Sequence, residues 1–121
     1  MPSRHPTLID VWINCPDDET ARHIGRTLVE RRLAACANVL PRIWSAYHWE
    51  GAIETGDEWP LLVKSREALF DALCEIVAEL HPYEVPSIVA VPVARVNPAY
   101  AEWVETETAD ALRAAGPPSP T

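Results

Sequence analysis

Glycine is scarce in this chain, and its three cysteines, Cys15, Cys36 and Cys74, form no CxxC pair. With so few glycines, the chain has no glycine-rich loop of the kind that holds nucleotide phosphates. The odd number of cysteines without a CxxC pair excludes a disulfide framework and a zinc knuckle, so we expect reduced thiols. No apolar run approaches the roughly 20 residues of a membrane helix, and residues 1–6 lack the apolar stretch of a signal peptide. These absences predict a cytoplasmic protein with no membrane partner.

Positive charge is also in short supply, because 10 basic residues stand against 18 acidic ones and give a net charge of -8. The basic residues do not cluster, so a surface that follows a phosphate backbone is hard to build, and we expect no nucleic-acid partner. The hydrophobic share of 48% is typical of a soluble globular protein, and 121 residues suffice for one core. We predict one domain over residues 7–115, an N-terminal tail over 1–6 and a Pro-rich C-terminal tail over 116–121.

Four segments carry the β-branched and aromatic residues or the alternation that are typical of strands. They are residues 7–14, 34–49, 52–64 and 87–96. Pro41 and Pro92 fall inside two of these segments and predict an edge position or a bulge. Glu50 and Gly51 predict a tight hairpin turn, with Gly51 at positive φ. Gly56 and Asp57 are expected to bend the strand that follows the turn.

Three segments have the periodicity and the end signals of helices. The first begins with acidic residues at Asp17 and ends near Arg32, the second is capped by Ser65 and ends at His81, and the third runs from Asn97 to Gly116. The resulting order is βαββαβ with an extra C-terminal helix. With right-handed crossovers, this order predicts an α+β ferredoxin-like sandwich, in which two helices cover one face of a four-stranded antiparallel sheet.

Linked motifs then add a resemblance that periodicity cannot supply. They lie at residues 32–38 (RLAACAN), 45–54 (SAYHWEGAIE), at Glu58 and Lys64, at 81–86 (HPYEVP), and at Tyr100 with Trp103. In sequence and spacing they resemble the divalent-cation tolerance (CutA1) family from the first strand to the last helix. Two positions depart from the family pattern: Ser87 stands where a glutamate is usual, and the pair Arg95 and Val96 stands where a glycine is usual. The first change removes a charged group from the cleft that the family forms between subunits.

The resemblance implies a non-enzymatic, PII-like homotrimer whose long hairpin extends across to neighbouring subunits. There is also a physical reason for assembly, because two helices cover only one face of the sheet. The other face and the hairpin carry aromatic residues such as Trp44 and Trp49, which a monomer would leave in an exposed apolar patch. No Ser-His-Asp signature or GxSxG motif supports catalysis. We therefore predict a homotrimer that is not an enzyme.

The resemblance also implies binding of divalent metal, with Cu²⁺ as the expected ion and a role in the response to metal ions. The candidate ligands are Cys36, His48 and His81, whose thiol and imidazole donors suit copper. Each has a plainer interpretation: Cys36 as a small buried residue in an alanine-rich strand, His48 as a surface residue, and His81 as a cation at a helix end. Cys74 is expected to pack in the core, and Cys15 to be a partly exposed thiol.

A second hypothesis is a signalling or scaffold trimer that binds a small anionic ligand in its inter-subunit clefts. Six residues match motif positions that line such clefts in the family: Tyr47, Trp49, Glu54, Glu58, Lys64 and Tyr83. Lys64 could pair with a carboxylate or phosphate of the ligand. Its plainer interpretation is an ion pair with Glu54 or Glu58, which contributes little on a strand.

Overall fold

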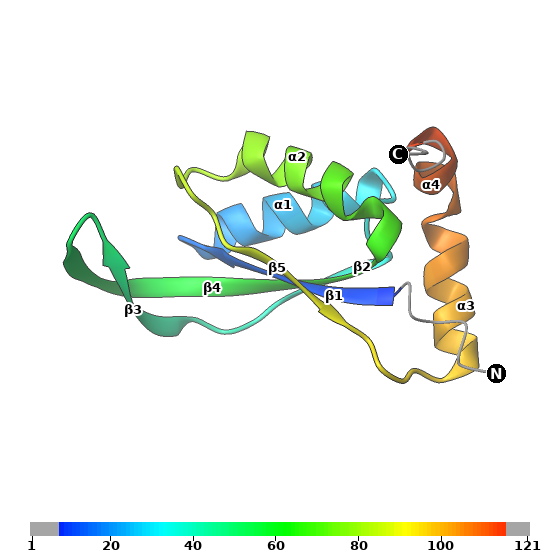
Figure 1. Cartoon of the computed structure of the whole chain (residues 1–121), viewed down its shortest axis with the longest axis horizontal. Coiled ribbons are helices and arrows are strands. Elements are labelled where there is room, and N and C mark those ends of the chain that lie inside the picture. Colours follow the sequence, from blue (N-terminus) through cyan, green and yellow to red (C-terminus); the bar gives the residue numbers. More distant parts are fainter. Residues whose placement is uncertain (1–7, 116–121) are drawn as a thin grey trace.

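The structure is a computed structural model that describes residues 8–115, so both expected tails, 1–6 and 116–121, lie outside the described residues. Figure 1 shows a sheet with two helices on one face and a further helical segment across one end of it. None of the described helices is long and apolar enough to cross a membrane. The elements are β1 (Leu8–Cys15), α1 (Asp18–Glu30), β2 (Cys36–Val39), β3 (Ile43–Trp49), β4 (Ala52–Arg66), a 3-10 turn (Glu67–Leu69), α2 (Phe70–Leu80), β5 (Ile88–Pro92), α3 (Pro98–Glu107) and α4 (Ala109–Ala115).

The described strands form one antiparallel sheet in the order β2-β4-β1-β5, with β3 also paired to β4. The α+β class and the antiparallel sheet are therefore confirmed. The expected strand over residues 34–49 is two strands, β2 and β3. Val39 of β2 pairs with Leu61 of β4, and Ile43 of β3 pairs with Glu58 of β4. The three residues 40–42 between these pairs therefore stand opposite only two residues of β4, 59 and 60. The one additional residue on this side is the bulge that Pro41 predicted.

The main core lies between the sheet and helices α1 and α2. Alternate residues of β1 point into it, and Val11, Ile13 and Cys15 are fully buried there. The predicted stripe of α2 supplies Leu69, just before the helix, and Leu73. Burial, together with the charges of nearby acidic groups, raises the pKa of the Cys15 thiol to about 12. The expectation of a partly exposed Cys15 is wrong.

Two helix boundaries differ from those predicted. Ser65 lies inside β4 and donates its hydroxyl hydrogen to the carbonyl of Leu33 at 2.6 Å, so it does not cap α2, which follows the 3-10 turn. The third helix is two helices that meet at Thr108. The buried Thr108 hydroxyl bonds back to the carbonyl of Val104 at 2.8 Å, a bond that competes with regular helix geometry.

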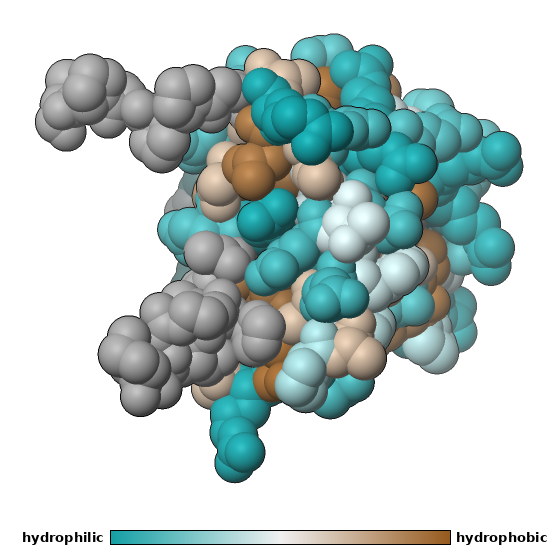
Figure 2. Space-filling view, turned by 90° about the vertical axis from the view of Figure 1, so that its right-hand side faces the viewer, coloured by the Kyte–Doolittle hydropathy of each residue, from teal (hydrophilic) through white to brown (hydrophobic). Residues whose placement is uncertain are grey.

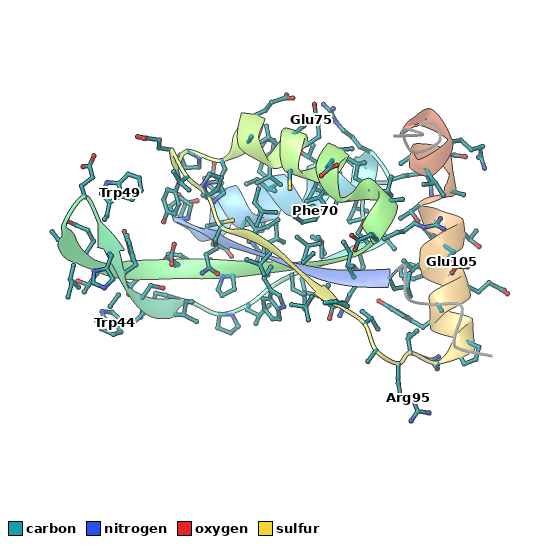
Figure 3. All side chains as sticks on the ribbon, in the orientation of Figure 1. Trp44, Trp49, Phe70, Glu75, Arg95 and Glu105 are labelled. Atoms are coloured by element: carbon teal, nitrogen blue, oxygen red, sulfur yellow. The ribbon has the colours of Figure 1, made fainter. Side chains whose placement is uncertain are left out.

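The hairpin and the open face of the sheet expose apolar side chains, as the sequence predicted. Trp44 and Ile53 are each 70% exposed on the hairpin. Figure 3 shows Trp44 and Trp49 on opposite sides of it. On β5, Val89 is 54% exposed and pairs with Trp12 of β1. The end of the molecule where α3 and α4 lie is largely hydrophilic, with small apolar patches between polar side chains (Figure 2).

Candidate functional site: the hairpin cleft

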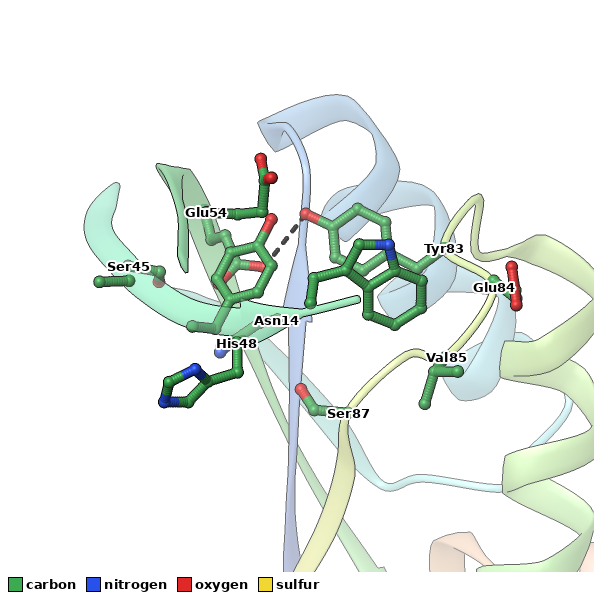
Figure 4. Close-up of a pocket in the computed structure, with 12 residues that line it drawn as sticks. Asn14, Ser45, His48, Glu54, Tyr83, Glu84, Val85 and Ser87 are labelled. Atoms are coloured by element: carbon green, nitrogen blue, oxygen red, sulfur yellow. Dashed lines mark hydrogen bonds between the residues drawn. The ribbon is translucent and has the colours of Figure 1, made fainter. Parts of the chain in front are cut away.

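A cleft of about 620 Å³ lies between the β3–β4 hairpin and the loop that leads from α2 to β5. We name it the hairpin cleft, and Figure 4 shows its lining. Its residues come from the end of β1, from both hairpin strands and from that loop: Asn14, Ser45, Ala46, Tyr47, His48, Trp49, Glu54, Glu58, Tyr83, Glu84, Val85 and Ser87. The size is within the range of roughly 300–1,000 Å³ that is common for small-molecule sites.

The hairpin side of the cleft depends on a two-residue turn. Glu50 has φ 50° and Gly51 has φ 81°, so both central residues lie in the left-handed region. This is the geometry of a type I′ turn, which matches the twist of paired strands. The positive φ predicted for Gly51 is confirmed, whereas that of Glu50 was not foreseen. The turn pairs Tyr47 with Glu54 and Trp49 with Ala52, which fixes the aromatic rings relative to the carboxylate.

The loop side is tied to β1 by His81, which is 6% exposed at the end of α2. The backbone N–H of Tyr83 donates to His81 Nδ1 at 3.2 Å, and because this leaves the imidazole hydrogen on Nε2, that nitrogen donates to the carbonyl of Asn14 at 2.8 Å. The rings of His81 and Tyr83 also contact each other, with centroids 4.6 Å apart. Both nitrogens of His81 are therefore engaged in holding the loop.

A buried carboxylate forms the base of the cleft. Glu58 is 8% exposed, and the hydroxyl of Tyr83 donates to its Oε2 at 3.1 Å. Within residues 8–115 Glu58 forms no ion pair. Burial, together with the hydrogen bond to Glu58 and its charge, raises the pKa of Tyr83 to about 12. The tyrosine thus remains a donor throughout the physiological range.

The lining is acidic and aromatic. Glu54, Glu58 and Glu84 contribute carboxylates, and no lysine or arginine is among the lining residues. Ser87 also lines the cleft and contributes no charge to it. The rings are those of Tyr47, Trp49 and Tyr83. Such a surface attracts cations and repels anions.

Five of the six residues predicted for a ligand cleft line this one, and Lys64 does not. Lys64 Nζ lies 3.0 Å from Asp10 Oδ1, so its partner is Asp10 and the expected ion pair with Glu54 or Glu58 is wrong. The pair lines a second hollow of about 230 Å³ beside α3, together with Arg95 and Tyr100. Sequence reasoning missed Glu84, although the motif at residues 81–86 contains it.

The three predicted metal ligands occupy three different environments. His48 lines the hairpin cleft, but its ring points to the opposite side of the hairpin strand from Glu54 (Figure 4). Cys36 Sγ lies 3.5 Å from the hydroxyl of Tyr100, whose pKa is raised to about 12 by burial and by this contact. His81 is the buried loop anchor. Across residues 8–115 there is no group of three or more His, Cys, Asp or Glu side chains placed to hold a metal ion. Ligation by these residues stays a prediction.

The fold and cleft define a small α+β protein with an antiparallel sheet and a cation-attracting site beneath a long hairpin. The sequence pattern of the CutA1 divalent ion tolerance protein family matches residues 9–107, and the chain belongs to this family. It is 43% identical over 97 residues to Protein CutA of Mus musculus, covering 80% of this chain and 55% of that protein. It thus spans about half the length of that relative.

Bacterial and archaeal relatives match over nearly their whole length. The divalent-cation tolerance protein CutA of Thermus thermophilus is 46% identical over 98 residues, which are 81% of this chain and 95% of that protein. Its solved structure superposes with a TM-score of 0.82, covering 84% of this chain and 98% of that one at 44% identity. A structure from Archaeoglobus fulgidus, described as the periplasmic divalent cation tolerance protein CutA, has a TM-score of 0.81 at 33% identity, covering 84% and 98%.

Proposed function

We propose that this chain is a non-enzymatic divalent-cation tolerance protein that binds divalent metal ions, Cu²⁺ foremost, and takes part in the cytoplasmic response to them. Its subunits have the ferredoxin-like arrangement and assemble as a PII-like homotrimer. The observation that carries the proposal is the acidic lining of the hairpin cleft in a chain of the CutA1 family. The three cysteines are free, as a reducing compartment requires.

The cleft supplies the right charge for a divalent cation. Glu58 is buried without a cationic partner among residues 8–115, and Glu54 and Glu84 stand at the same opening. Carboxylate oxygens attract any divalent ion, whereas an imidazole such as that of His48 favours copper and zinc over calcium and magnesium. The His48 ring lies on the opposite side of the hairpin strand from Glu54, so it does not join these carboxylates within the described chain. Of the three predicted ligands, His48 is the one that lines this cleft. It is therefore our first candidate for metal binding.

Assembly completes the site in this proposal. Because no three donors converge within one described chain, a second copy must contribute the remaining ligands. The exposed apolar side chains of the hairpin, Trp44 and Ile53 above all, give a neighbouring subunit a surface to cover. Light scattering at micromolar concentration tests this step. We expect three times the 13.5 kDa of one chain, and a mass of one chain contradicts the assembly.

Titration calorimetry with Cu²⁺ tests the metal itself, with Zn²⁺ run in parallel because thiols reduce Cu²⁺. We expect His48→Ala to weaken binding at least about tenfold, since a lost donor leaves coordination incomplete. Cys36→Ser is the control, because Cys36 lies beside Tyr100 and is not among the residues that line the hairpin cleft; it should bind as the parent does. His81→Ala should act through the loop, with a smaller loss. Equal affinities in parent and His48→Ala would remove this histidine from the site.

The alternative is a PII-like signalling or scaffold trimer that binds a small molecule in the same cleft. The specific observation in its favour is the cleft's volume of about 620 Å³, which far exceeds the share of roughly 30 Å³ that one water molecule takes in liquid. The anionic ligand expected from Lys64 does not suit this lining, because Lys64 is elsewhere and paired with Asp10.

A further inference from the structure

The hairpin cleft combines a buried anion with aromatic walls. Glu58 is 8% exposed and receives one neutral hydrogen-bond donor, the hydroxyl of Tyr83. Burying a carboxylate is costly unless a cation or several donors compensate its charge. Across the described residues no lysine, arginine or histidine forms an ion pair with it. The described residues therefore supply no positive charge to Glu58, and a cation bound in the cleft would supply it.

The rings beside this carboxylate suit a particular kind of cation. Tyr47, Trp49 and Tyr83 line the same opening, and Figure 4 shows the Tyr83 ring close to the carboxylate-bearing hairpin strands. Aromatic faces attract ammonium and guanidinium groups, and they pack against the carbon skeleton that carries such a group. A bare metal ion uses neither property. Among the other polar lining residues, Asn14 and Ser87 can accept hydrogen bonds from N–H donors.

From these observations we infer that the hairpin cleft binds a small organic cation, a primary ammonium or guanidinium compound with an apolar body. The charged group pairs with Glu58 and the body lies against Trp49 and Tyr83. The inference uses the cleft of the proposed function but not its metal. Glu54 and Glu84, which are exposed at the opening, attract the cation and exclude anions of the same shape.

Three probes that share a phenyl ring and carry head groups of different charge test this inference: 2-phenylethylammonium, neutral 2-phenylethanol and anionic phenylacetate. Dissociation constants are measured by ligand-observed NMR at pH 7, with a chelator present so that no metal takes part. We expect the ammonium compound to bind at least about tenfold more tightly than the alcohol, and phenylacetate not to bind. Equal affinity for the ammonium compound and the alcohol overturns the inference.

Charge-neutral variants locate the site. Glu58→Gln should weaken the binding of 2-phenylethylammonium at least about tenfold, because the carboxylate that pairs with the ammonium group is lost. Glu75→Gln removes the same charge from the outer side of α2, away from the cleft (Figure 3), and should leave affinity unchanged. If Glu58→Gln fails to fold, Glu84→Gln is the deciding variant, because Glu84 is exposed in a loop and does not pack in the core. Glu84→Gln should weaken binding of 2-phenylethylammonium about threefold. Equal affinities in Glu84→Gln and Glu75→Gln would refute the placement.

The outcomes separate this inference from the metal proposal. Loss of Cu²⁺ binding in His48→Ala, with no ammonium binding by the parent, leaves the metal site and removes the organic ligand. If ammonium binding depends on Glu58 and the protein does not bind metal, the organic ligand is supported and the metal proposal is overturned. Where both ligands bind, a competition titration shows whether they share Glu58.

Discussion

The bond between Tyr83 and Glu58 supports the most specific stability prediction. Tyr83→Phe removes the hydroxyl that donates to Glu58 Oε2 at 3.1 Å and leaves a carboxylate that is 8% exposed without this donor. A hydrogen bond to a charged acceptor contributes roughly 1.5–3 kcal/mol when buried. Tyr83 itself is only half-buried, so water replaces part of the loss. We expect the free energy of unfolding to fall by about 1–2 kcal/mol, measured by urea denaturation at fixed protein concentration.

Tyr47→Phe is the matched control, since it makes the same chemical change in the same cleft. Within residues 8–115 the Tyr47 hydroxyl has no hydrogen bond, and its loss should change stability by less than about 0.5 kcal/mol. A double-mutant cycle with Glu58→Gln isolates the pair. Equal effects of Tyr83→Phe and Tyr47→Phe, or a coupling energy near zero, would show that the bond to Glu58 does not stabilise the protein.

The same bond gives a pH dependence of defined sign. The pKa of Tyr83 is raised from 10.0 to about 12, so the folded protein favours the protonated phenol. Its contribution is fully present below pH 10 and is lost as the pH rises through about 12. The difference in stability between the parent and Tyr83→Phe should therefore stay constant from pH 7 to 10 and shrink above that. A difference that shrinks already near pH 8 would contradict this assignment.

The remaining predictions concern three other positions. Gly25→Ala should destabilise the protein by about 1–2 kcal/mol, because the new Cβ would lie 2.9 Å from Leu61 Cδ1 in the core; Gly56→Ala, with open space around it, is the control in the same melting experiment. Gly51→Val should cost more than about 1 kcal/mol through its φ of 81°, and an unchanged melting temperature would count against the type I′ turn. Cys15, fully buried with a pKa of about 12, should be the last thiol to react with iodoacetamide at pH 8, as mass spectrometry of the labelled peptides can show.

Features that depend on local chemistry could be predicted from the sequence. β-Favouring residues identified β1, and the turn at Glu50 and Gly51 identified β4 as its partner strand. The apolar stripe identified α2, and Pro41 identified the bulge that divides the second expected strand. Gly51 marked the turn because few other residues tolerate its φ. In each case the signal comes from residues close together in the chain, and the backbone has few ways to satisfy it.

Features that depend on distant partners could not be predicted in this way. Ser65 has the residue type of a helix cap, yet the carbonyl of Leu33 comes within 2.6 Å of it and it stays in the strand. Thr108 divides the last helix because its buried hydroxyl bonds back to Val104. Cys15 follows the alternation of β1 to its end, and only the packing of α1 and α2 shows that no solvent remains there.

The charge of the cleft is the feature that sequence reasoning had most reason to miss. The motifs placed Glu54, Glu58 and Lys64 on one strand, and this spacing favoured a mixed site that could hold an anion. The register decides otherwise, because Lys64 lies opposite Asp10 of β1, where the two side chains neutralise each other 3.0 Å apart. The lysine is thereby removed from the cleft, while Glu58 stays buried there beside Tyr83. A single pairing between two strands thus argues against the anionic ligand of the second hypothesis and leaves a cation as the expected ligand of this cleft.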